Sequence, residues 1–143
     1  MKQKHLLAAG VCLLLAAALT ASSLRHSSPE AFYAEHQDAL HTAAQQILTS
    51  GTVQDISVEG VRQIDAWAGP PLVIEFYLSG SGLGPSTHYK GLYYSPEDVP
   101  AAFQNVSAPL EPSDVGWTWT DGTDNHGSTT RVAPCWYTFE AHF

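Results

Sequence analysis

The last quarter of the sequence carries the side chains best suited to chemistry. Asp121, Asp124 and His126 fall in one short polar segment, and Glu140 and His142 follow two positions apart near the C-terminus. Imidazole and carboxylate groups are the donors from which proteins build zinc sites. We therefore take this Asp, His and Glu set as the candidate metal ligands, and the sequence assigns no catalytic residue.

A zinc site could also recruit His88, from the middle of the chain. Together with His126, Glu140 and His142 it would exceed the three protein ligands that a catalytic zinc ion needs. No pair has the His-x-x-x-His spacing of a helical site, and Glu140 and His142 merely share one face of an expected strand. His126 would reach that face only if its hairpin folded over it. The sequence therefore ranks the zinc site second to a non-catalytic reading, and it predicts no cofactor.

The segment from Asp121 to Gly127 also has features of a calcium loop. Asp121, Thr123 and Asn125 place oxygen-bearing side chains at alternate positions. The glycine, however, falls at the seventh position instead of the sixth, and Val132 stands where the loop needs a glutamate. Asp-Gly and His-Gly pairs are equally typical of hairpin turns that need positive φ. The pattern favours an ordinary hairpin turn.

The glycine-rich stretch 80–86 does not indicate a phosphate site. A phosphate cradle leads into a helix, whereas a strand is expected after this stretch. Residues 80–84 read Gly-Ser-Gly-Leu-Gly, with glycine where a hydrolase elbow would carry its nucleophile. We expect a hairpin loop here.

Aromatic side chains offer a third kind of site. Trp117 and Trp119 point to the same face of an expected strand, and Tyr94 lies on a neighbouring strand. If that face were exposed, it would form an aromatic platform for a glycan or a peptide. Burial under the helix or between strands is the favoured alternative, because the domain needs these side chains for its core.

The N-terminus predicts the compartment in which these residues work. Lys2 and Lys4 precede an apolar run from Leu6 to Leu19, which is typical of an export signal. Extension of the run to Leu24 gives a length just sufficient for a membrane span. We therefore expect residues 1–24 to be a signal or membrane anchor, residues 25–28 a short linker, and 29–143 a single extracytoplasmic domain. Residues 6–24 would hold it in the cell membrane as a single-pass protein, and cleavage would release it as a secreted one.

The composition excludes some partners. From Ser23 onward the chain carries four basic and fourteen acidic residues, a net charge of −10 with histidines neutral. Nucleic acid and anionic lipid surfaces need a positive partner surface, so neither is expected to bind this domain. Cys135 is the single cysteine outside the N-terminal segment, so no disulfide within the domain is expected.

Periodicity predicts one helix and several strands. Ser28 as N-cap, Pro29 at the first helical position and Gly51 as C-cap bound an amphipathic helix of about 21 residues. Alternation then predicts strands over 53–58, 62–67, 72–78, 87–94, 116–120, 129–132 and 136–143, the first two forming one bent strand or two short ones. Residues 99–104 read as an edge strand or a helical turn, and 105–114 as a loop.

These elements define an α+β fold. One long amphipathic helix is expected to pack on an antiparallel meander of four to six strands, in a cystatin-like arrangement preceded by the N-terminal signal or anchor helix. Such an analogy carries no activity with it.

Four segments also resemble a group of small exported bacterial proteins. They are Gly-Leu-Gly-Pro-Ser-Thr-His-Tyr-Lys-Gly-Leu-Tyr-Tyr-Ser (82–95), Trp-Thr-Trp (117–119), Asp-Asn-His-Gly (124–127) and Trp-Tyr-Thr-Phe-Glu-Ala-His-Phe (136–143). The resemblance covers roughly the second half of the chain. It implies the same export segment and domain, and it supplies no substrate or cofactor.

The sequence thus predicts a non-catalytic binding or envelope-associated module with an unidentified protein or glycan partner. The alternative is a small metal-dependent enzyme or metal-binding protein that uses the 121–142 set.

Overall fold

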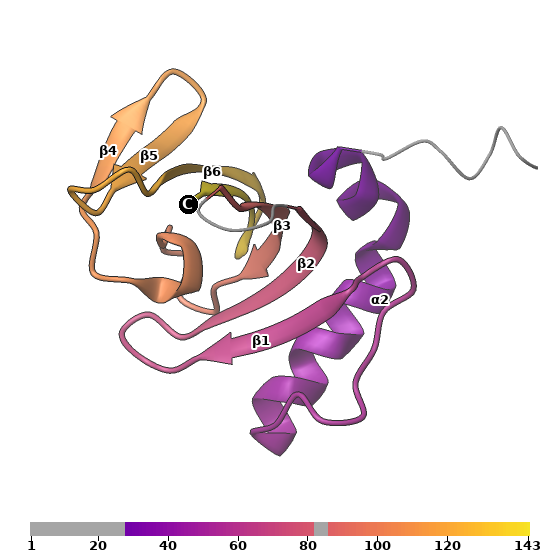
Figure 1. The fold of residues 1–143 in the computed structure, drawn as a ribbon. Helices are drawn as coiled ribbons and strands as arrows, with labels where there is room; N and C mark the ends of the chain where they lie inside the picture. Colours follow the sequence, from indigo (N-terminus) through magenta and orange to yellow (C-terminus); the bar gives the residue numbers. More distant parts are fainter. Residues whose placement is uncertain (1–27, 82–85) are drawn as a thin grey trace, which may run out of the picture.

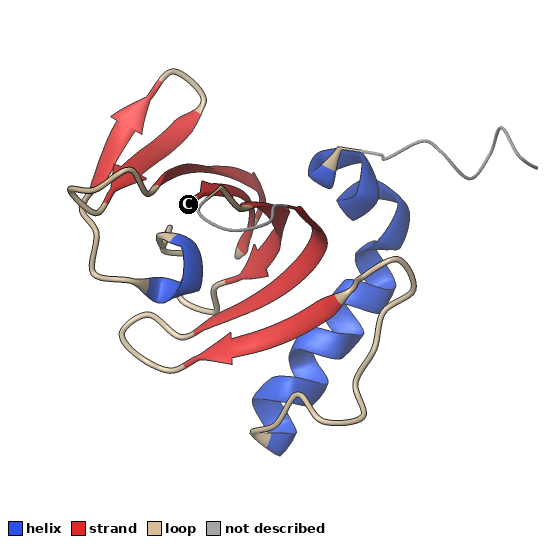
Figure 2. Cartoon of the chain, viewed as in Figure 1, coloured by secondary structure: helices blue, strands red, loops and turns tan. Residues whose placement is uncertain are grey.

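The protein is an α+β domain with one long helix and a seven-stranded antiparallel sheet (Figures 1 and 2). The computed structural model describes residues 28–81 and 86–143. The expected export segment and most of the expected loop 80–86 lie outside the described residues. Among the residues that are described, no helix combines the length and apolar character needed to cross a membrane.

The helix, α2, spans Pro29–Ser50 and confirms the predicted element. Its first turn is capped by Ser28, whose hydroxyl oxygen accepts a hydrogen bond from the backbone N–H of Ala31 at 3.3 Å. Its last turn is closed by Gly51, which has φ of 72° and donates its N–H to the carbonyl of Ile47 at 2.8 Å. Both ends therefore use the residues that helix capping rules select.

The sheet is larger than predicted and is not a simple meander. Its strand order is β1-β2-β3-β7-β6-β5-β4, and every neighbouring pair is antiparallel. The C-terminal strand β7 lies between β3 and β6, so segments distant in sequence become neighbours. The strands are β1 (Gln63–Trp67), β2 (Val73–Ser81), β3 (His88–Tyr94), β4 (Leu110–Ser113), β5 (Gly116–Thr120), β6 (His126–Ala133) and β7 (Trp136–His142).

Three predictions need correction, and one open alternative is resolved. Residues 53–58 form no strand but a connection with turns, although Val58 is buried in the core. The segment read as loop contains strand β4, and Pro112 is tolerated there because β4 is the last strand of the sheet. Strand β6 begins at His126, three residues earlier than expected. Residues 99–104 contain no edge strand, and a short 3₁₀ helix, η2 (Phe103–Asn105), begins within them.

Helix α2 covers one face of the sheet. Leu40, Ala44 and Ile47 of the helix pack with Phe76 of β2 and Trp136 of β7 in one buried cluster. These apolar residues recur at three- and four-residue spacing on α2, as burial of a helix face requires.

A second layer, which the sequence did not predict, covers the opposite face. Ala101, Ala102 and Phe103, leading into η2, are buried against Tyr77 and Phe139. Figure 1 shows the sheet curving so that η2 lies on its inner side and α2 on its outer side. Both faces are thus packed, which gives a domain without a disulfide a larger core than one helix could provide.

Candidate functional site

Three histidines form a row across adjacent strands. In the strand register His88 of β3 lies opposite His142 of β7, and His142 lies opposite His126 of β6. The imidazole rings of His88 and His142 stack with centroids 4.2 Å apart, and those of His126 and His142 with centroids 4.9 Å apart. The topology that places β7 between β3 and β6 therefore assembles three residues from distant parts of the chain.

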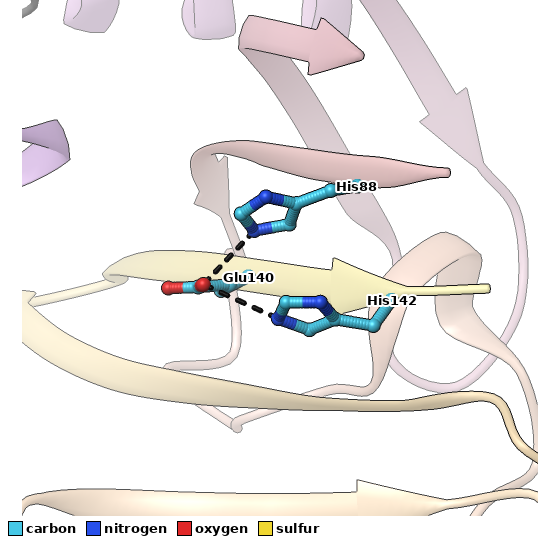
Figure 3. Close-up of side chains that lie close together, drawn as sticks. All are labelled: His88, Glu140 and His142. Atoms are coloured by element: carbon cyan, nitrogen blue, oxygen red, sulfur yellow. Dashed lines mark hydrogen bonds and ion pairs between the residues drawn. The ribbon is translucent and has the colours of Figure 1, made fainter. Parts of the chain in front are cut away.

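A carboxylate completes the cluster. Glu140 precedes His142 by two residues, so both side chains project from the same face of β7. Figure 3 shows the rings of His88 and His142 side by side, both directed at the carboxylate of Glu140. Their Nε2 atoms lie 2.9 and 3.2 Å from the same carboxylate oxygen, Oε1. Ligand atoms of these three residues lie within 4.8 Å of one another, close enough to hold one metal ion.

The cluster is half-buried and carries one cation. Side chains of His88, Glu140 and His142 are 33–40% exposed. Lys90, opposite Glu140 in the β3–β7 pairing, places its Nζ atom 3.5 Å from the same Oε1. Burial raises the pKa of Glu140, but the charge of Lys90 and the hydrogen bond from His88 outweigh that effect and hold the pKa below its ordinary value. The carboxylate is therefore ionised and available to a cation at neutral pH.

His126 is oriented by the hairpin that precedes it. Its Nδ1 atom lies 2.8 Å from the backbone carbonyl of Asp124. Because a carbonyl can only accept, Nδ1 carries the proton of the neutral ring and Nε2 keeps a free lone pair. Such a carbonyl partner is the usual way in which a metal-binding histidine is held in the correct tautomer. His126 stacks on His142, but it is not among the residues whose ligand atoms lie within 4.8 Å of one another.

The two aspartates of the candidate set do not join the cluster. The carboxylate of Asp121 accepts hydrogen bonds from the backbone and hydroxyl groups of Thr123 and from the side-chain amide of Asn125. The Thr123 bonds, with that of Asn125, lower the pKa of Asp121. Asp124 meets His126 through its backbone carbonyl only. The segment forms a hydrogen-bonded turn between β5 and β6, and the oxygens expected of a calcium loop are used within it.

The aromatic residues do not share one exposed face. Trp119 is 4% exposed and packs, with the half-buried Trp117, in the cluster on the η2 side of the sheet. Tyr94 packs against the cluster on the α2 side. The three side chains are therefore divided between two core clusters and do not form a joint platform.

The sequence identified the three histidines as candidate ligands, but it did not indicate Lys90 or explain why the histidines lie close together. His88 and Lys90 alternate on β3 as Glu140 and His142 do on β7, so each pair was visible as one strand face. The missing information was the pairing of β3 with β7, which no local pattern specifies. His126 reaches the row through the register of β6 with β7, without its hairpin folding over the sheet.

The chain matches no protein-family model, no curated protein and no solved structure in the comparisons made with it.

Proposed function

We propose that this domain binds a divalent transition-metal ion, of the Zn²⁺ or Cu²⁺ class, through His88, Glu140 and His142. The observation that carries the proposal is the convergence of two imidazole nitrogens on one carboxylate oxygen. Zinc takes such nitrogen and oxygen ligands in tetrahedral sites, and imidazole also suits copper. His126, stacked on His142 but outside this group, is the proposed fourth ligand after a rotation of its side chain.

Metal binding would replace the hydrogen bonds that now join the three side chains. In the metal-free cluster, the Nε2–H groups of His88 and His142 can donate hydrogen bonds to Oε1 of Glu140. A metal ion would replace these protons and would be held by the same three groups. A neutral ring would then carry its proton on Nδ1, which leaves the lone pair of Nε2 for the metal ion.

We propose a binding role rather than a catalytic one. The ligands lie on a half-exposed strand surface, where water has access from one side. A catalytic metal works best in a cavity that excludes water and positions a substrate. The proposal thus combines the two functions predicted from the sequence, a non-catalytic binding module and a metal-binding protein.

The compartment is part of the proposal. The N-terminal charged and apolar segment supports an exported domain, anchored in the cell membrane through residues 6–24 or secreted after cleavage. The cystatin-like arrangement remains an analogy of fold and adds nothing to the function. A protein or glycan partner would be additional to the metal.

The test is a zinc titration of the full chain against a chromophoric chelator of known affinity. We expect stoichiometric binding by the wild type, and a loss of affinity of about tenfold or more in His88→Ala, Glu140→Gln and His142→Ala. His36→Gln is the matched control, because His36 lies on α2 and stacks on Phe32. Absence of wild-type binding, or an equal loss in the control, would refute the proposal.

A further inference from the structure

Lys90 competes for the atom that a metal ion would need. Its Nζ lies 3.5 Å from Oε1 of Glu140, the same oxygen that the Nε2 atoms of His88 and His142 approach. The register of β3 and β7 fixes this relation, because Lys90 and Glu140 are directly opposite each other. The position is thus a property of the sheet and not of a flexible loop.

If the ammonium group stayed at that oxygen, electrostatic repulsion would weaken the binding of a divalent cation there. Two like charges separated by a few ångströms repel each other, and the repulsion is only partly screened at a half-buried site. Lysine, however, is attached through a flexible four-carbon stem, and the Lys90 side chain is 41% exposed. It can therefore swing into solvent without disturbing the strands.

We infer that Lys90 is a tethered competitor for Glu140: it holds the carboxylate when the metal is absent and is displaced when the metal binds. This inference rests on the proposed function, since it concerns the regulation of the same site. Lys90 is a positioning residue and not a ligand. It adds a positive charge beside Oε1 of Glu140, which His88 and His142 also approach, and so lowers the affinity of the site for a metal cation.

The inference predicts a gain of affinity when the competitor is removed. Lys90→Gln keeps a side chain of similar length without the charge, and the full chain should then bind Zn²⁺ about 3- to 10-fold more tightly than the wild type. Arg62→Gln is the control, because it removes another exposed positive charge, just before β1 and two strands away from β3. Its affinity should stay within about twofold of the wild type.

A double-variant cycle tests whether Lys90 acts through Glu140. In the Glu140→Gln background the gain in zinc affinity from Lys90→Gln should shrink by more than half, because the carboxylate for which Lys90 competes is absent. The inference is overturned if Lys90→Gln binds no tighter than the wild type, if Arg62→Gln gains equally, or if the gain persists undiminished in Glu140→Gln. These outcomes leave zinc binding by the wild type intact and are thus distinct from failure of the proposed function. Absence of binding in every variant would overturn both.

Discussion

At the scale of single residues, the histidine cluster contrasts with a carboxyl group buried elsewhere in the domain. Glu75 is 1% exposed, and it accepts hydrogen bonds from the indole N–H of Trp67, the hydroxyl of Tyr77 and the backbone N–H of Gln104. These donors join β1, β2 and η2 around one side chain. Glu75 therefore fastens the inner layer to the sheet, and we assign it a structural role.

The environment of Glu75 gives the domain a pH dependence. Burial raises the pKa of Glu75 from 4.5 to about 7, although its three hydrogen bonds favour the ionised form. The native state therefore retains a proton that the unfolded chain loses above its ordinary pKa. Stability from this group is fully present below pH 4.5 and is lost as the pH rises through about 7.

We expect the wild type to be less stable at pH 8 than at pH 5, by on the order of 2–3 kcal/mol from this group. Denaturant unfolding at several pH values measures the slope, and Glu75→Gln, which cannot ionise, should flatten it. An equal slope in the wild type and in Glu75→Gln would contradict the assignment.

The candidate site shows what residue types alone can predict. His88, His126, Glu140 and His142 were identifiable as a ligand set from their chemistry. Asp121 and Asp124 were equally plausible ligands by type. Hydrogen bonds within the turn engage the carboxylate of Asp121, and Asp124 lies outside the group whose ligand atoms converge. Those bonds are geometric facts that spacing cannot supply.

At the scale of elements, local rules succeeded where an element is defined by its own residues. Capping residues predicted the ends of α2 correctly. Alternation predicted the ends of β2, β3, β5 and β7 to within about three residues of the observed ends. Strand β4 was missed because its Pro112 argues against a strand, and only the edge position makes that proline acceptable. The placement of β7 beside β3 was also missed, since strand order arises from tertiary packing.

The C-cap of α2 offers a clean test of helix termination. Gly51 has φ of 72°, and a Cβ atom there would meet nothing within 4 Å. Gly51→Ala should therefore destabilise the domain by about 1 kcal/mol through backbone conformation alone. Gly51→Asn should cost less, because asparagine tolerates the left-handed region. Chemical denaturation compares the variants, and equal stability of Gly51→Ala and the wild type would contradict this account of the cap.

At the scale of the whole molecule, the strand order decides which residues can meet. Residues 88, 126, 140 and 142 are brought together because β7 pairs with both β3 and β6. The same pairing places Cys135, in the turn between β6 and β7, at the end of the hairpin opposite to His126 and His142. The folded domain therefore offers nitrogen and oxygen ligands at one end of β7 and keeps its thiol at the other.

X-ray absorption spectroscopy of the full chain loaded with one equivalent of Zn²⁺ tests the central claim most directly. The account predicts a first shell of nitrogen and oxygen at about 2.0–2.1 Å, with the outer-shell scattering of at least two imidazole rings and no sulfur at about 2.3 Å. A zinc–sulfur distance, or an oxygen shell without imidazole, would contradict it.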